Sequence, residues 1–146
     1  MRTVVAAVLF ALAVAGLAPA TPAAAHPHIF IDAKADLVFS GQTLTAIKHA
    51  WQFDDAFSAF AVQGLDTNRD GKLSADELAP LAALNVKGLA NYGYYTYAMV
   101  DQKNVELAPP TDYRVEWSGS RLTLFFTLPL KAPAPVKTAA VQIFDV

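Results

Sequence analysis

Residues 66–77, with the sequence DTNRDGKLSADE, restrict the possible folds of this chain more than any other segment. Oxygen-bearing side chains recur at alternate positions, and Gly71 is the sixth residue, where the chain has to turn sharply. A twelve-residue calcium loop takes its ligands from positions 1, 3, 5, 7, 9 and 12 and needs glycine at position 6. We therefore predict a calcium site whose ligands are Asp66, Asn68, Asp70, Lys72, Ser74 and Glu77. Lys72 would contribute its backbone carbonyl oxygen. The alternative is a solvated acidic turn that binds no metal.

The segments on both sides of this loop have helical patterns. Asp54 or Asp55 can cap a helix whose apolar residues recur at helical spacing and which runs directly into Asp66. After the loop, Ser74 and Glu77 match the capping box S-x-x-E and open a second helix. Together these signals predict an EF-hand-like helix–loop–helix. Because the sequence contains one such loop, we expect its calcium to be structural rather than regulatory.

The rest of the chain has β-type sequence. Residues 29–39 and 44–53 alternate around a turn at Gly41, and residues 113–117 and 121–130 flank a second turn at Gly119. Residues 94–101 and 141–146 have the composition of further strands. The predicted fold class is α+β: an N-terminal β-hairpin, then the EF-hand-like helix–loop–helix, then antiparallel strands that form a sheet or a sandwich.

The first 25 residues have the three parts of a secretory signal peptide. Arg2 is followed by an apolar stretch, residues 4–18, and Ala23 and Ala25 form the A-x-A pattern that signal peptidase recognises. We expect residues 1–25 to be removed, which leaves a single domain, residues 26–146, in the periplasm or outside the cell. A retained membrane anchor is the alternative.

Charge and motif content exclude several classes of function. Without Arg2, the predicted mature chain has 10 basic residues instead of 11, against 13 acidic ones, so its formal net charge is −3. This charge argues against nucleic-acid binding, which needs a basic face. The sequence has no cysteine and no G-x-S-x-G, phosphate-binding or H-E-x-x-H motif. We therefore expect a protein that is not an enzyme. A copper-dependent oxidase that uses His26 is the enzymatic alternative with a chemical basis.

The three histidines lie near the start of the predicted mature chain, at His26, His28 and His49. Cleavage after Ala25 would give His26 a free α-amine, which can chelate a transition metal together with its own imidazole. His28 and His49 are candidates for further ligands, and a zinc ion would also suit one of the nearby carboxylates Asp32, Asp54 and Asp55. Zn²⁺, Ni²⁺ and Cu²⁺ all remain open, as does the alternative that these histidines bind no metal.

Five sequence blocks, taken in their order, resemble the domain-of-unknown-function 1007 family: AHPHIFIDAKADLVF, WQFDDAFSAF, GLDTNRDGKLSADEL, NVKGLANYGYYTYAMVD and LAPPTDYRVEW. The resemblance implies a periplasmic protein associated with zinc, nickel or cobalt transporters of the inner membrane. It also implies that His26 and His28 bind metal and that residues 66–77 form an EF-hand-type loop. Members of the family usually extend past the end of this sequence, which leaves open a domain truncated at its C-terminus, a fragment, or a naturally shortened form.

These inferences lead to two functional hypotheses. The first is a periplasmic metal-binding accessory protein of a metal-ion transport system, with a structural calcium in the loop at residues 66–77. The second is a calcium-rigidified interaction module that docks on a membrane partner and has no transition-metal role.

Overall fold

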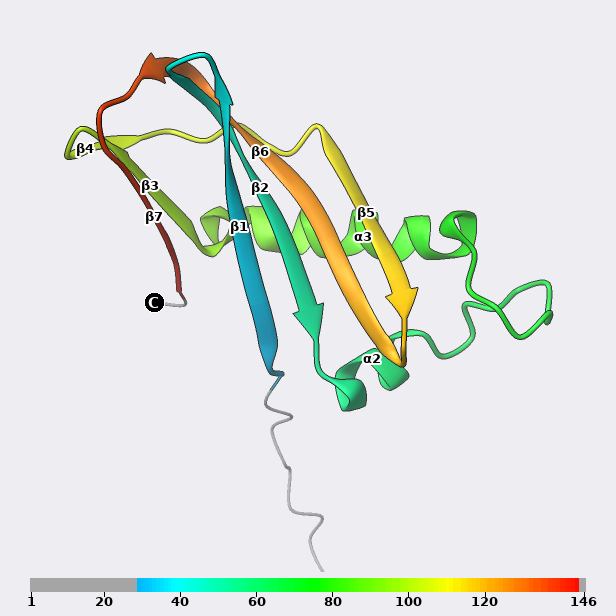
Figure 1. Cartoon of the computed structure of the whole chain (residues 1–146). Helices are drawn as coiled ribbons and strands as arrows, with labels where there is room; N and C mark the ends of the chain where they lie inside the picture. The colour runs from blue at the N-terminus through cyan, green and yellow to red at the C-terminus, as the bar shows by residue number, and fades with distance from the viewer. Residues whose placement is uncertain (1–28, 145–146) are drawn as a thin grey trace, which may run out of the picture.

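The computed structural model describes residues 29–144 (Figure 1). Within these residues the elements are β1 (Ile31–Ser40), β2 (Thr43–Phe53), α2 (Asp55–Ala61), α3 (Ala75–Ala90), the 3-10 helix η1 (Gly93–Tyr95), β3 (Thr96–Val100), β4 (Lys103–Val105), β5 (Asp112–Ser118), β6 (Arg121–Pro135) and β7 (Ala139–Ile143). No helix in this part of the chain has the length and apolar character needed to cross a membrane.

The strands form two antiparallel sheets, and β6 connects them. The larger sheet has the strand order β1-β2-β6-β5, and the smaller sheet has the order β4-β3-β7. The segment after β4 runs beside β6, since the amide of Ala108 donates to the carbonyl of Pro129 at 2.7 Å and that of Lys131 donates to Glu106 at 2.9 Å. With its 15 residues, β6 therefore contacts β2, β5 and this segment.

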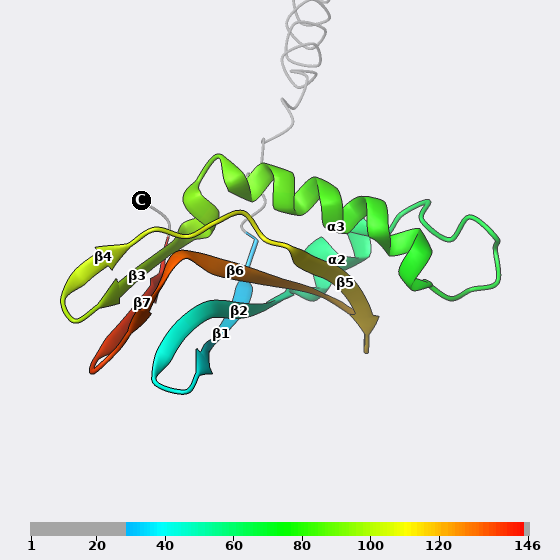
Figure 2. The same cartoon turned by 90° about the horizontal axis from the view of Figure 1, so that it is seen from above.

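The alternation of β6 builds the core. Leu122, Leu124, Phe126, Leu128 and Leu130 are each 4% exposed or less, as expected for every second residue of a strand that faces one side of a sheet. The first four pack with Trp51 and Phe53 of β2 and with buried residues of α3. Figure 2 shows α3 lying across this face of the larger sheet, so the core is enclosed between the helix and the strands.

The predicted architecture is wrong in its main feature. The N-terminal hairpin is not a separate unit, because β2 also pairs with β6 and the hairpin forms half of the larger sheet. The first helix, α2, ends at Ala61 and does not run into Asp66. Gly64 has a φ of +78°, a left-handed conformation typical of residues that follow a helix. Helices and strands are both present, as in the α+β class, but an EF-hand-like helix–loop–helix does not organise the fold.

Candidate functional site

The loop between α2 and α3 is closed by its own side chains. Asp66 accepts hydrogen bonds from the amides of Asp70 at 3.1 Å and Gly71 at 2.9 Å. Asn68 accepts the amide of Asp70 at 2.9 Å, and Asp70 accepts the amide of Lys72 at 2.8 Å. Gly71 has a φ of +78°, which suits the sharp turn predicted at this position. Three of the predicted ligands therefore point at the backbone of the loop itself.

Glu77 ties the two ends of this loop together. Its Oε2 accepts the amide of Ser74 at 3.0 Å and the hydroxyl of Ser74 at 2.8 Å, and the predicted capping box is present. Its Oε1 accepts the amide and the hydroxyl of Thr67 at 2.8 and 2.9 Å. These hydrogen bonds, led by the one from the Ser74 amide, lower the pKa of Glu77 from 4.5 to about 2. Glu77 is therefore ionised across the physiological pH range.

The donor set of the loop fits a hard cation, because carboxylate, amide, carbonyl and hydroxyl oxygens are the ligands that calcium prefers. Within residues 29–144, no three His, Asp or Glu side chains are grouped closely enough to hold a metal ion. Glu77 could coordinate an ion with both oxygens only after these oxygens had given up the hydrogen bonds that they accept from Thr67 and Ser74.

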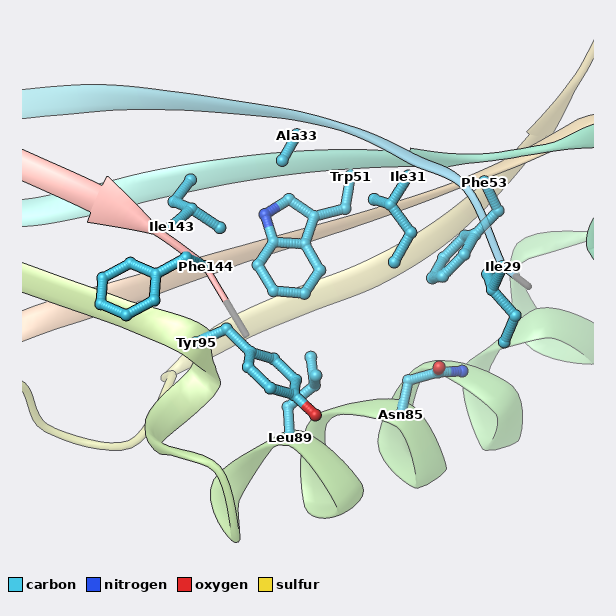
Figure 3. A pocket seen from close by; sticks show the side chains of 10 residues that line it. All are labelled: Ile29, Ile31, Ala33, Trp51, Phe53, Asn85, Leu89, Tyr95, Ile143 and Phe144. Carbon is cyan, nitrogen blue, oxygen red and sulfur yellow. The ribbon is translucent and has the colours of Figure 1, made fainter. Parts of the chain in front are cut away.

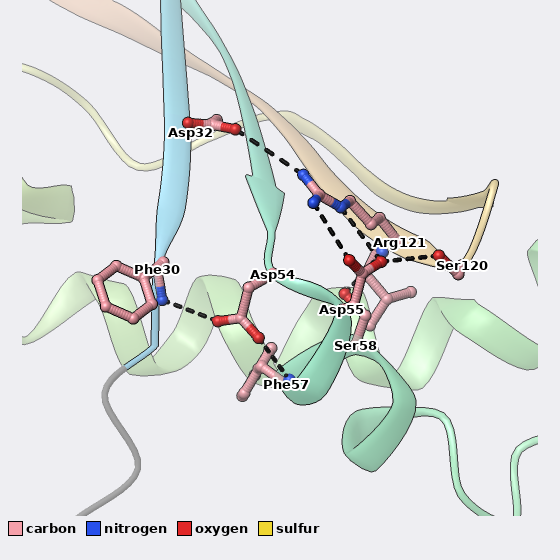
Figure 4. A network of polar contacts seen from close by, with 9 residues as sticks. Phe30, Asp32, Asp54, Asp55, Phe57, Ser58, Ser120 and Arg121 are labelled. Atoms are coloured by element: carbon pink, nitrogen blue, oxygen red, sulfur yellow. Dashed lines mark hydrogen bonds and ion pairs between the residues drawn. The ribbon is translucent and has the colours of Figure 1, made fainter.

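A second polar cluster anchors the start of the described chain to α2 (Figure 4). Asp54 caps the helix by accepting the amide of Phe57 at 2.8 Å, and its other oxygen accepts the amide of Phe30 at 2.8 Å. The amide of Asp54 also donates to the carbonyl of Phe30 at 3.0 Å. The hydrogen bonds from Phe57 and then Phe30 lower the pKa of Asp54. A carboxylate is thus fixed directly beside the backbone at the beginning of β1.

The neighbouring carboxylates have different surroundings. Asp55 accepts the hydroxyl of Ser120 at 2.7 Å and two N–H groups of Arg121 at 3.2 Å, and the Arg121 bond is the main cause of its lowered pKa. Arg121 also lies 4.0 Å from Asp32, whose side chain is 79% exposed. Asp55 therefore links α2 to the turn before β6, while Asp32 remains open to solvent (Figure 4).

The predicted histidine ligands do not meet in the described structure. His26 and His28 lie outside the described residues. His49 is 2% exposed and stacks on Phe126 with a centroid distance of 4.5 Å. Its Nδ1 accepts the indole N–H of Trp51 at 3.3 Å, and its Nε2 is 3.4 Å from the hydroxyl of Thr96. Burial lowers the pKa of His49 from 6.5 to about 4, so the ring is neutral at pH 7.

Sequence reasoning missed an apolar groove of about 520 Å³ between the inner side of β1 and β2 and the helix α3 (Figure 3). Its main lining residues are Ile31, Trp51, Phe53, Leu89, Tyr95 and Ile143. They come from five elements far apart in the sequence, which is why no local pattern predicts the groove. The alternation of Ile31, Ala33, Ala35 and Leu37 in β1 is the local signal that could have indicated an apolar face on this strand.

Comparison with protein families gives one match over nearly the whole chain. A family model described as "Protein of unknown function (DUF1007)" matches residues 11–146. Comparisons with curated proteins and with solved structures found no significant match.

Proposed function

The chain belongs to the DUF1007 family of proteins of unknown function, and from that premise we propose that it is a periplasmic metal-binding accessory protein of a zinc, nickel or cobalt transport system. Its N-terminal His-Pro-His segment binds the transition metal, and the loop at residues 66–77 binds a structural calcium. Its partner is a metal transporter of the inner membrane. Capture and transfer of an ion require binding groups and no catalytic residue.

The hydrogen bond between the amide of Phe30 and Asp54 is the observation that supports this proposal most. His28 precedes Phe30 by two residues in the sequence, and Asp54 is the carboxylate that binds the amide of Phe30. Imidazoles together with a carboxylate form a common ligand set for zinc. Asp32 of β1, with its exposed side chain, offers a second carboxylate. Asp55 is ion-paired with Arg121 and His49 is buried in the core, so both are left out of the proposed site.

Zinc binding tests the proposal. The chain exported by a bacterial host, stripped of metal and offered calcium, zinc, nickel and copper together, is expected to bind one calcium and one transition-metal ion in native mass spectrometry. The double variant His26→Ala/His28→Ala is expected to lose the transition metal and keep the calcium. Asp54→Asn, which removes the charge of a proposed zinc ligand, is expected to weaken zinc binding about tenfold.

Asp36→Asn is the matched control, because Asp36 is an exposed carboxylate in the middle of β1. It is expected to leave zinc affinity unchanged. Full zinc affinity in the double histidine variant would contradict the proposed site.

Calcium binding by the loop has its own test. Calcium at 100 times its dissociation constant is expected to stabilise the fold by about 2.7 kcal/mol, seen as a rise in melting temperature that magnesium does not reproduce. Asp70→Asn removes a charged predicted ligand and is expected to reduce this rise. Asp76→Asn removes an acidic residue of the same loop at a position that supplies no ligand, and should retain it. An equal calcium response in the two variants would contradict calcium binding by the predicted ligands.

The apolar groove favours the second candidate function, an interaction module without a transition-metal role. In that case the loop and its calcium rigidify a scaffold that docks on a membrane partner. A chain that responds to calcium in the melting experiment but binds no zinc, nickel or copper would select this candidate.

A further inference from the structure

The backbone of β1 has one free edge. β1 is the outermost strand of the larger sheet, and no described segment pairs with its second edge. Phe30 lies opposite Asp54, and its carbonyl accepts the amide of Asp54 across the start of the hairpin, as in a hydrogen-bonded pair. Because such pairs alternate along antiparallel strands, the N–H and C=O groups of Ile31, Ala33 and Ala35 point away from β2, toward that free edge.

The side chains of these same residues form an uncovered apolar row. The strand register places Ile31, Ala33 and Ala35 opposite three residues of β2 that face the core: Phe53, Trp51 and His49. Ile31 is 40% exposed, whereas Phe53 opposite it is 6% exposed. The core that covers β2 therefore stops short of β1, and Ile31 and Ala33 line the open side of the groove (Figure 3).

The opposite face of β1 carries alternating charges, Asp32, Lys34 and Asp36. Proteins often protect a free edge with a proline, a bulge or a charge that points inward. β1 contains no proline, the irregularity in its pairing with β2 lies between Val38 and Phe39, and its charges lie on the face away from the core. Exposed charges, lysine especially, also protect an edge, so the stretch from Ile31 to Leu37 is open to a strand whose charges complement Asp32, Lys34 and Asp36.

We propose that the occupant of this edge is a second copy of the same chain, with the two β1 strands paired antiparallel around a twofold axis. If Ala35 lies opposite its own copy, Lys34 faces Asp36 of the second copy, and the symmetry repeats this contact. If Ala33 lies opposite its own copy, Lys34 faces Asp32 of the second copy instead. Opposite charges in cross-strand pairs are stabilising, so the alternating charges complement themselves in both registers.

The same pairing joins the two larger sheets into one continuous sheet. It places the apolar rows of both β1 strands side by side on the inner face, next to the two grooves. The free N–H and C=O groups of Ile31, Ala33 and Ala35 gain partners along the new edge. This inference concerns β1 and does not rest on either metal site.

The test is the oligomeric state of the exported chain, measured by analytical ultracentrifugation over a range of concentrations. The chain is expected to be a dimer. Lys34→Asp places like charges opposite each other in both registers and is expected to weaken dimerisation at least tenfold. Asp36→Lys is expected to do the same if Ala35 lies opposite its copy, and Asp32→Lys if Ala33 does. Lys103→Asp, a charge reversal of an exposed residue on β4, is the matched control and is expected to dimerise like the unmodified chain.

Mixing the variants distinguishes this interface from any other. Equal amounts of Lys34→Asp and Asp36→Lys restore opposite charges across the interface, so the mixture is expected to form heterodimers if Ala35 lies opposite its copy. In the other register, a mixture of Lys34→Asp with Asp32→Lys is expected to form them. If neither mixture forms heterodimers, the proposal is overturned.

Ala35→Pro provides a test that does not depend on charge. It removes an N–H group that points away from β2, so the pairing of β1 with β2 is retained while the pairing with a second copy is lost. Ala35→Ser keeps this N–H and is expected to remain dimeric. A chain that is monomeric at all concentrations, or an Ala35→Pro variant that is folded and dimeric, would overturn the proposal and leave the edge to a different partner.

Discussion

Lowering the pH from 7 to 4 is expected to remove about 3 kcal/mol of stability through His49 alone. Burial lowers the pKa of this ring from 6.5 to about 4, so the unfolded chain takes up the proton more readily than the folded chain. The stabilising effect of the neutral ring is fully present above pH 6.5 and is lost as the pH falls toward 4. A difference of 2.5 in pKa corresponds to about 3 kcal/mol at pH 4.

The measurement is the free energy of unfolding in urea at several pH values, for the unmodified chain and for His49→Gln. Glutamine cannot be protonated in this range, so the variant is expected to be less stable at pH 7 but to lose little stability between pH 6.5 and pH 5. Glu77 titrates in a lower window, between its ordinary pKa of 4.5 and its folded pKa of about 2, and so does not obscure this comparison. Parallel pH profiles for the two chains would contradict the assignment to His49.

The variant Phe126→Ala is expected to lose about 3–5 kcal/mol of stability, because it removes a large ring from the centre of the core. Phe126 is 2% exposed, stacks on His49 and meets Trp51 edge-on with a centroid distance of 5.1 Å. Removal of the ring leaves a cavity among side chains of β2, β6 and α3, and these side chains can relax into it only in part.

Phe125→Ala is the matched control, since Phe125 is the preceding residue on the same strand and faces the other side of the sheet. Its ring is half-buried under the guanidinium of Arg114, at 4.2 Å from the centroid. Truncation there opens the surface rather than the core, so a markedly smaller loss is expected. Urea unfolding measures both variants, and equal losses would show that the core does not depend on the inner face of β6.

Local patterns predicted the individual elements better than their assembly. The alternation in residues 29–39 and 44–53 corresponds to β1 and β2, and Ser74 and Glu77 form the capping box that begins α3. The pairing of β2 with β6 joins segments that no local pattern connects, and it turned the predicted hairpin into half of a larger sheet. The end of α2 was misplaced because the apolar spacing continued through Gly64, whose left-handed conformation follows the end of the helix.

The candidate site shows the same division. Gly71 and the oxygen-bearing residues of the loop could be recognised because the pattern lies within twelve residues. The contact of Asp54 with Phe30 could not be recognised from the sequence, because it joins residues 24 positions apart. His49 could have been placed in the core from sequence, because it lies on the same face of its strand as Ile47 and Trp51.

The position of β6 in the chain has a consequence for the order of folding. Trp51 of β2 pairs with Leu124 of β6, which follows it by 73 positions. An isolated two-stranded hairpin is at best marginally stable in water, so β1 and β2 lack a stable sheet until residues 121–135 have been synthesised. Folds that depend on such distant pairings form slowly, in milliseconds to seconds. The larger sheet therefore cannot be completed before residues 121–135 have left the ribosome.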